Sequence, residues 1–474
     1  MRSRAAASRW FTALAALVSI VLIASGCSDS HTRSAAASSA TDLFSVGDLP
    51  YSTGPNGMRP NAPTPAETVT GTDGGRIDRL VSTAIDDVQK FWAQTYPAVF
   101  GHPFSAETRL QSWDSNSPAA PQFCGQNGHA YPNAAYCQED DSIGWDRGVL
   151  IPTYQRAFTD IGVLAVMAHE YGHRISNLAA INDSSAPVVN EQRSDCFSGA
   201  YLHWVAAGQS PAFTLDSTSG LTEAAATIAA SRDIRRTANE HGTAFDLVSA
   251  FSLCVHGGAG ACRDLNLDAI HARQSKQPAP YDAAGALVPQ QFSAAGLSAV
   301  VKSLAGYFNP GPAAPQVRAA TADCTGSVAR QPVTYCPSSN TVLYDSDRLT
   351  TIGRVGYSGP APIPTLMTDG FSAYSLVASR YALAVLHGRG QPTDRPSTAA
   401  MAACMTGQWA AATRDVGDFT LGPGDVDAAV SGLLDNGLAA SDAESRTLPS
   451  GLTRVDAFGS GYLGGPTGCD RYRT

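Results

Sequence analysis

The spacing of apolar residues divides the chain into an apolar run near the N-terminus, a polar stretch and a long folded remainder. The apolar run extends from Phe11 to Ile23 and follows three arginines. From Ser28 to about Gly75 the chain is rich in Ser, Ala, Thr, Pro and Gly without a sustained apolar period, which is typical of a flexible tether. Apolar residues begin to recur at helical spacing near Ile77, so we expect the folded part to begin at residue 76.

Residues 1–27 have the pattern of an export signal, because a basic segment and an apolar run lead into small residues. The stretch Ala24-Ser25-Gly26 ends in Cys27 and resembles a lipobox, in which the cysteine is lipidated and becomes the mature N-terminus. Ala24 stands where that pattern more often has Leu, so ordinary cleavage is an alternative. A transmembrane anchor is disfavoured, since the run is shorter than the roughly 20 apolar residues that span a bilayer. We therefore predict an exported protein, lipid-anchored to the outer face of the bacterial cell membrane.

Composition limits the fold and the partners. The 474 residues are 43% hydrophobic and 15% charged, so the chain can bury a large core and is long enough for two or more domains. The formal net charge is −9, and Lys90, Lys276 and Lys302 are the only lysines. No lysine-rich patch can neutralise phosphates, so nucleic acid is excluded as an expected partner.

Comparison of the chain with itself predicts two related halves. Three segments of the first half recur in the same order in the second, each without gaps and each with a shared cysteine: Tyr136–Asp146 recurs as Tyr335–Asp345, Cys196–Tyr201 as Cys404–Trp409, and Ala250–Cys262 as Ala457–Cys469. Coincidence among small residues is the alternative, but the cysteines argue against it. We expect one domain at residues 76–282 and a second copy of it at residues 283–474.

The repeat also predicts the disulfides. With Cys27 set aside, nine of the 10 cysteines remain, so at least one lacks a partner within the chain. The pairing that respects the repeat joins Cys124 with Cys137, Cys196 with Cys262, Cys324 with Cys336, and Cys404 with Cys469. Cys254 is left over because its counterpart is Gly461. Disulfides persist in exported proteins, whereas the alternative is that several of these are buried thiols.

A metal-binding motif lies inside an apolar helical stretch. His169 and His173 are four residues apart and therefore share one helical face, where two imidazoles can bind a single zinc ion. Glu170 lies between them, next to the coordination position that stays open. Eighteen positions after His173 comes Glu191, which we predict as the third ligand, followed one helical turn later by Asp195. Asp195 is suited to accept the free ring N–H of a zinc-bound histidine. A solvated surface helix is the alternative for this second element.

These two elements resemble those of the thermolysin-like zinc peptidases, in which H-E-x-x-H is followed by N-E-x-x-S-D, here Asn190–Asp195. The resemblance is closer to the neutral zinc metallopeptidases of bacteria, which have a cysteine directly after that Asp and a downstream His-Gly-Thr, here His241–Thr243. It covers about residues 76–265 and implies a zincin-like α+β domain. It further implies that Asp195 orients His169 and that His241 stabilises the oxyanion, although a capping or surface histidine is a comparable alternative for His241.

The expected activity is zinc-dependent hydrolysis of peptide bonds in peptide or protein substrates at the cell envelope. Glu170 would remove a proton from the attacking water and pass it to the leaving amine. The segment Ile143–Ile151 is a candidate for the edge strand that pairs with a substrate, or else a plain strand of the sheet. One alternative is a non-catalytic envelope scaffold stabilised by zinc, against which Glu170 argues, because a structural site needs no base. Another is a surface protein whose second half binds partners.

The second half is predicted to lack a metal site. The match of Cys196 with Cys404 sets an offset of 208 residues, whereas the match of Tyr136 with Tyr335 sets one of 199, so nine residues are inserted between them. Gly356–Pro364 is a plausible place for this insertion. At offset 208 His169 corresponds to Val377, Glu170 to Ala378, His173 to Tyr381, Glu191 to Ala399 and Asp195 to Ala403. We expect this half to fold alike, to pack on the catalytic half and to shape its substrate cleft.

Overall fold

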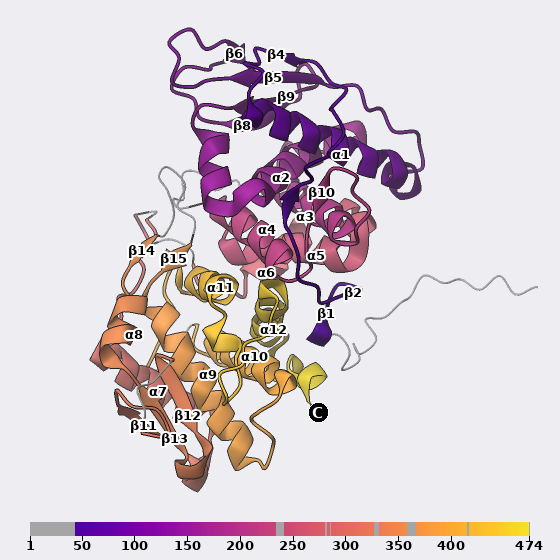
Figure 1. The fold of residues 1–474 in the computed structure, drawn as a ribbon. Coiled ribbons are helices and arrows are strands. Elements are labelled where there is room, and N and C mark those ends of the chain that lie inside the picture. The colour runs from indigo at the N-terminus through magenta and orange to yellow at the C-terminus, as the bar shows by residue number, and fades with distance from the viewer. Residues whose placement is uncertain are drawn as a thin grey trace, which may run out of the picture. The chain divides into compact units, whose positions relative to one another are not determined.

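The computed structural model describes residues 43–233, 241–279, 282–284, 286–326, 331–357, 366–414 and 417–473. The predicted leader with its lipidation site Cys27, and the first residues of the predicted tether, lie outside this set. The described residues all belong to one unit, which spans Ser39–Thr474. They form an α+β fold in which helices predominate and the strands form small sheets, so the expected class is confirmed (Figure 1).

The folded part begins earlier than composition predicted. The described part of the predicted tether contains four short strands. β1 (Ser45–Val46) pairs with β2 (Leu49–Pro50), β3 (Gly57–Met58) pairs with β10 (Phe213–Thr214), and β4 (Val69–Thr70) pairs with β5 (Arg109–Trp113). The Asn56 amide also donates a hydrogen bond of 2.8 Å to Asp216. The predicted boundary at Gly75 is therefore too late, because pairing with remote segments leaves no mark on local composition.

The first half combines one sheet with a group of helices. Helix α1 (Arg76–Phe100) buries the apolar side chains that predicted it, and it is followed by a sheet of strand order β4-β5-β9-β8. Strand β5 is parallel to β4 and β9, and β8 is antiparallel to β9. The remaining elements are β6 (Gln122–Phe123), β7 (Gln126–Asn127), β8 (Ala134–Cys137), β9 (Ser142–Asp146), α2 (Leu150–Leu178), α3 (Pro187–Ala206), α4 (Ser219–Ala230), α5 (Ala244–Arg263) and α6 (Leu267–Gln274).

The sheet corrects the expected edge strand. Residues 142–146 form β9, which lies between β5 and β8, and residues from Leu150 onward already belong to helix α2. The edges of the sheet are instead β4 and β8, each of which has a hydrogen-bonded neighbour on one side only. The periodicity of β9 could not distinguish an inner strand from an edge strand, because strand order depends on pairing between remote segments.

The second half has a closely similar order of elements. Its sheet has the order β11-β13-β12, in which β11 is parallel to β13 and β12 is antiparallel to it, as β5, β9 and β8 are in the first half. The elements are α7 (Ala294–Phe308), β11 (Gln316–Ala319), β12 (Val333–Cys336), β13 (Thr341–Tyr344), α8 (Ser346–Ile352), β14 (Gly356–Tyr357), β15 (Met367–Thr368), α9 (Gly370–Gly388), α10 (Pro396–Ala412), α11 (Asp425–Asp435) and α12 (Gly451–Gly464). Strands β14 and β15 pair where the first half continues α2 through a kink at Phe158 and Thr159.

Two glycines show that the helices also pack alike in the two halves. A Cβ atom at Gly199 of α3 would lie 2.3 Å from the carbonyl oxygen of Phe251 in α5. A Cβ atom at Gly407 of α10 would lie 2.1 Å from the carbonyl oxygen of Phe458 in α12. Each glycine lets one helix touch the backbone of the other. Helix α5 is long and apolar enough to cross a membrane, but this contact and its buried residues identify it as a core helix.

One hydrophobic cluster contains side chains of both halves, so the halves pack on each other as expected. Hydrogen bonds cross between them as well. Ser252 donates to Asp456 at 2.8 Å, and the backbone N–H of Gly451 donates to the Thr222 hydroxyl at 2.8 Å. The second half is therefore part of the same folded body as the metal motif.

Three of the four predicted disulfides are present: Cys124 with Cys137, Cys324 with Cys336, and Cys404 with Cys469. The fourth prediction is wrong in one respect. Cys254, expected to be unpaired, lies at bonding distance from both Cys196 and Cys262, and these three buried cysteines form one group. Cys254 and Cys262 are eight residues apart on α5 and so share the helical face that packs on α3. Since one sulfur forms a single disulfide, one thiol of the three stays free.

Candidate metal centre

Helix α2 presents the two predicted histidine ligands side by side. The Nε2 atoms of His169 and His173 are 3.1 Å apart, as expected for residues one helical turn apart. His169 is 9% exposed, because the helix is buried by apolar residues on both sides of the motif. Gly172 lies between the histidines and α3, where a Cβ atom would be only 2.8 Å from Ser194 Cα. The absence of a side chain at this position lets the two helices approach.

Helix α3 supplies the third predicted ligand. Glu191 Oε2 lies 3.2 Å from His169 Nε2 and 3.4 Å from His173 Nε2. The ligand atoms of these three side chains all lie within 4.8 Å of one another. A tetrahedral zinc ion with bonds of about 2.1 Å separates its ligand atoms by about 3.4 Å. The residues therefore fit a zinc ion with two nitrogen ligands, one oxygen ligand and one position left for water or substrate.

Asp195 lies behind the first histidine, as predicted. Its Oδ1 is 2.7 Å from His169 Nδ1, and its side chain is 1% exposed. This contact holds the proton on Nδ1 and turns Nε2 toward Glu191, which is the arrangement that a metal ligand requires. Burial lowers the pKa of His169, but the carboxylates of Asp195 and Glu191 outweigh it and hold that pKa well above its usual value. A cation bound at Nε2 would take the place of the second proton.

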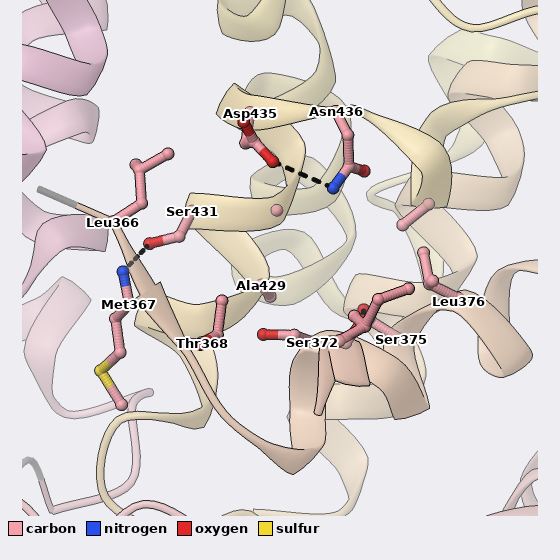
Figure 2. Close-up of a pocket in the computed structure, with 13 residues that line it drawn as sticks. Leu366, Met367, Thr368, Ser372, Ser375, Leu376, Ala429, Ser431, Asp435 and Asn436 are labelled. Carbon is pink, nitrogen blue, oxygen red and sulfur yellow. Dashed lines mark hydrogen bonds between the residues drawn. The ribbon is translucent and has the colours of Figure 1, made fainter. Parts of the chain in front are cut away.

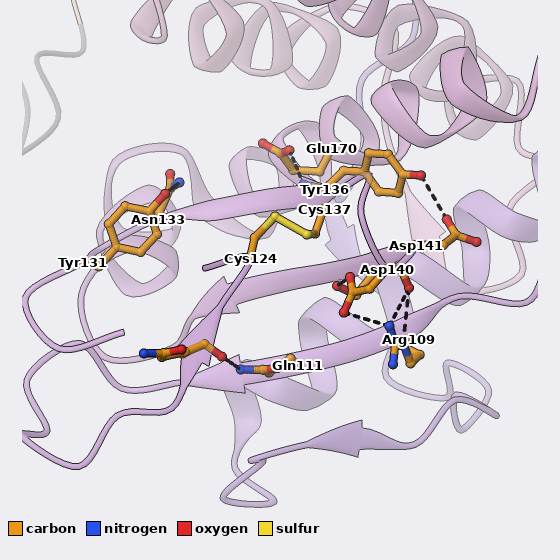
Figure 3. The surroundings of a disulfide bond; sticks show 12 residues. Arg109, Gln111, Cys124, Tyr131, Asn133, Tyr136, Cys137, Asp140, Asp141 and Glu170 are labelled. Atoms are coloured by element: carbon orange, nitrogen blue, oxygen red, sulfur yellow. Dashed lines mark hydrogen bonds and ion pairs between the residues drawn. A yellow bond between two sulfur atoms is a disulfide. The ribbon is translucent and has the colours of Figure 1, made fainter. Parts of the chain in front are cut away.

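Glu170, which follows His169 on α2, is hydrogen-bonded to strand β8. Its Oε2 accepts a hydrogen bond of 3.0 Å from the backbone N–H of Tyr136, next to the Cys124–Cys137 disulfide (Figure 3). Burial raises the pKa of Glu170, while the neighbouring imidazoles oppose that rise. A carboxylate with a raised pKa is protonated more readily than an exposed one, which suits a general base.

His241 lies beside Glu191 but outside the ligand group. Its Nε2 is 3.4 Å from Glu191 Oε2, yet it is not among the side chains whose ligand atoms all lie within 4.8 Å of one another. Asp233 accepts hydrogen bonds from the backbone N–H groups of His241 and Gly242 at 2.9 and 2.8 Å, and its Oδ1 is 3.2 Å from His241 Nδ1. Burial lowers the pKa of His241, but Asp233 and Glu191 reverse this and raise it.

Asp233 is a residue of the site that the sequence reasoning missed. It follows the apolar helix α4 and precedes His241 by eight residues, a spacing that belongs to no metal or catalytic motif we know. The only available signal was an acidic residue directly after an apolar helix. Its role depends on how α4 and α5 are placed relative to each other, which the local sequence pattern does not determine.

The corresponding positions of the second half are apolar and buried: Val377, Ala378 and Tyr381 on α9, and Ala399 and Ala403 on α10. Among the described residues, the groups of three potential ligands are the histidine–glutamate group, a group of three cysteines, and Cys124 and Cys137 with Glu139, all in the first half. The cysteine groups contain disulfide partners, which makes them poor metal sites. Nearby in α9 a buried Arg380 donates to Ser441 at 2.7 Å, and burial lowers its pKa to about 10.

A cavity of about 160 Å³ lies in the second half between α9, α11 and β15 (Figure 2). Its polar groups are already engaged: Ser431 accepts from the backbone N–H of Met367 at 3.1 Å, and Asn436 donates to Asp435 at 3.2 Å. The cavity contains no histidine and no pair of convergent carboxylates. Histidine and paired carboxylates are thus found together at the α2–α3 site and not here.

No protein-family model, no curated protein and no solved structure matches this chain.

Proposed function

We propose that the protein is a zinc-dependent peptidase that hydrolyses peptide bonds in peptides or proteins at the cell envelope. The observation that carries the proposal is that the ligand atoms of His169, His173 and Glu191 lie at the spacing of a tetrahedral zinc site. Glu170 follows His169 on the same helix and is not one of these three ligands. A structural zinc site would close all four positions with protein ligands. This site instead leaves one position open and places a carboxylate of raised pKa next to it.

The chain's own residues have distinct roles in the proposed reaction. Zinc would supply a Lewis acid that polarises the scissile carbonyl and makes a water easier to deprotonate. Glu170 takes the proton from that water and later delivers it to the leaving amine. His241, held by Asp233, donates a hydrogen bond to the oxyanion that develops at the scissile carbonyl. Asp195 keeps His169 in the tautomer that binds metal.

Strand β8 is suited to hold the substrate backbone. It is one edge of its sheet, and its Tyr136 N–H already donates to Glu170, so the edge passes directly beside the proposed base. An extended peptide can add to such an edge through main-chain hydrogen bonds. The Cys124–Cys137 disulfide anchors β8 to the β6–β7 hairpin and so restricts its movement.

The repeat and the leader support two further parts of the proposal. We infer that the two halves are copies of one zincin-like domain, of which the second is degenerate and binds no zinc. The parallel order of elements and the matching contacts of Gly199 and Gly407 support this. Export and lipidation at Cys27 rest on the leader sequence, which lies outside the described residues.

The test compares the mature wild-type chain with Glu170→Gln and with Glu107→Gln, an exposed control. Zinc content is measured by elemental analysis and peptide hydrolysis by mass spectrometry on an unfolded protein substrate. We expect about one zinc per chain in all three, with turnover lost only in Glu170→Gln. Equal turnover in Glu170→Gln and wild type would remove the general base. Full zinc content without any hydrolysis by the wild type would favour the zinc-stabilised scaffold instead.

A further inference from the structure

The second half contacts both ends of the segment that carries His241. Residues 234–240 separate two described stretches, Arg232–Asp233 and His241–Phe245, both of which belong to the first half. Asp427, on helix α11 of the second half, touches each of them. We propose that Asp427 is a positioning residue, which holds these two stretches together and so sets the place of His241 beside Glu191. This inference rests on the proposed peptidase function.

The contact on the C-terminal side is made to the start of helix α5. Asp427 Oδ1 accepts a hydrogen bond of 3.3 Å from the backbone N–H of Phe245, and the N–H of Ala244 also donates to the carboxylate. These N–H groups belong to the first turn of α5 and have no partner within the helix. A carboxylate at a helix N-terminus also interacts favourably with the helix dipole. Asp427 therefore fixes the point at which α5 begins, three residues after His241.

The contact on the N-terminal side is made to Arg232 at the end of helix α4. Arg232 Nε lies 3.9 Å from Asp427 Oδ2, and the two residues are 4% and 5% exposed. The Arg232 guanidinium also lies over the ring of Tyr357, at 5.5 Å from its centroid, so β14 of the second half joins this contact. An ion pair in such surroundings is little screened by solvent. Asp427 thus restrains the residue next to Asp233.

From these two points the restraint reaches His241 through hydrogen bonds within the first half. Asp233 accepts from the backbone N–H groups of His241 and Gly242, and its own N–H donates to Gly242 O at 3.0 Å. Thr243 and Asp246 form a capping box that continues into α5. Asp233, Thr243 and Asp427 line the same small cavity. Movement of Asp427 would therefore be passed to the backbone of His241 through the first turn of α5 and through the hydrogen bonds of Asp233.

The placement of Asp427 gives the metal-free half a role in the proposed reaction. A buried carboxylate is expensive unless it is paired, and a purely apolar seam would pack the halves together as well. The carboxylate instead lies where α11 contacts both stretches. Correct placement of a group that binds the oxyanion requires accuracy of about 1 Å, since misplacement on that scale lowers rates about a hundredfold.

The experiment uses the full mature chain in four forms: wild type, Asp427→Asn, His241→Ala and the double variant. We expect Asp427→Asn to retain its zinc and its KM while kcat falls about tenfold to a hundredfold. In the His241→Ala background the same substitution should change kcat less than twofold, because the group that it positions is gone. Asp435→Asn, at the exposed far end of α11, is the matched control and should leave kcat unchanged.

Hydrogen exchange of the backbone N–H groups of residues 241–245 provides a readout that does not depend on activity. We expect these groups to exchange at least tenfold faster in Asp427→Asn than in wild type. If Asp427→Asn does not fold, Asp427→Glu serves for the same two measurements and should show smaller changes in the same direction. Equal losses of kcat with and without His241, or unchanged exchange, would overturn the inference. Faster exchange in Asp427→Asn, together with a wild-type chain that hydrolyses nothing, would uphold the contact while the peptidase proposal fails.

Discussion

Replacement of Gly172 with alanine should separate helices α2 and α3 and weaken zinc binding. Gly172 immediately precedes the ligand His173, and a Cβ atom there would lie 2.8 Å from Ser194 Cα and 3.0 Å from Ser194 O. Ordinary contacts of a Cβ atom begin at 3.4 Å. The difference between 3.4 and 2.8 Å means that the helices must move apart by about 0.6 Å, because both atoms of Ser194 are backbone and cannot rotate away.

This displacement is large on the scale of the metal centre. Glu191 Oε2 is 3.2 Å from His169 Nε2 and 3.4 Å from His173 Nε2. An added separation of about 0.6 Å exceeds the tolerance of about 0.2 Å for zinc–ligand distances. We therefore expect zinc affinity to fall about tenfold to a hundredfold, as happens when groups that orient metal ligands are disturbed. The added methyl group should also destabilise the fold by about 1–3 kcal/mol.

The assay measures the zinc Kd by competition with a chromogenic chelator, and the free energy of unfolding by denaturant titration of the metal-free protein. The matched control is Gly407→Ala in the second half, where a Cβ atom would lie 2.1 Å from Phe458 O on helix α12. This control should lose stability to a similar extent and keep the zinc Kd of the wild type. Wild-type zinc affinity in Gly172→Ala, together with the expected loss of stability, would show that the α2–α3 distance does not set the site.

Four further predictions test other parts of the structure. Glu191→Ala should lose most of its zinc by elemental analysis, since two histidines remain, and full occupancy would reject it as a ligand. Burial raises the pKa of Asp425, which faces Asp369, from 3.8 to about 7. Between these two values the folded protein holds a proton that the unfolded chain has released. The stability of the fold therefore falls as pH rises from about 4 to about 7. Asp425→Asn should therefore raise the melting temperature more at pH 8 than at pH 4, and an equal change at both pH values would contradict this. Peptide mapping should find Cys254 in a disulfide with one of the other two buried cysteines, whereas a free thiol at Cys254 in every molecule would restore the pairing predicted from the repeat. Cys27→Ser should move the protein from the membrane fraction to a soluble or unprocessed form, and an unaltered distribution would oppose lipidation.

The metal-site geometry could be predicted from the sequence because each of its parts is local. The four-residue spacing of His169 and His173 places both imidazoles on one face of any helix, and Glu191 and Asp195 likewise share a face of the next helix. Apolar residues around both motifs required the two faces to be buried against each other. Distances of 2.7 to 3.4 Å among these four side chains agree with that reasoning.

Features that depend on remote pairing could not be predicted in the same way. The inner position of β9 follows from its pairing with β5 and β8, which lie on either side of it in the sheet. Cys254 lies near Cys196 because α5 packs on α3. The repeat could not predict this contact, because the residue that matches Cys254 in the second half is Gly461. Asp233 acts on His241 through hydrogen bonds between residues eight apart in the sequence, a spacing that no short motif encodes. Each of these features is decided by which segments meet and not by the pattern within one segment.

The charges buried at the α2–α3 site argue for a bound cation independently of the motif. Glu170, Glu191 and Asp195 bring three carboxyl groups into one buried region, and burial raises the pKa of Glu170 and of Asp195. Asp195 Oδ2 is buried and accepts no hydrogen bond. The carboxylates of Asp195 and Glu191 hold the pKa of His169 well above its usual value, so a protonated His169 offsets part of this negative charge in the metal-free chain.

A divalent cation would offset the same charge without protons, and its binding would release protons from the histidines. At the positions that the proposed repeat sets against His169, Glu191 and Asp195, the second half has the buried apolar residues Val377, Ala399 and Ala403. A buried charge nearby, Arg380, is satisfied by the hydroxyl of Ser441 and by backbone carbonyls. In the second half, the positions that the repeat sets against the proposed ligands therefore hold no carboxyl group whose charge a cation would offset, whereas in the first half such carboxyl groups meet at the α2–α3 site.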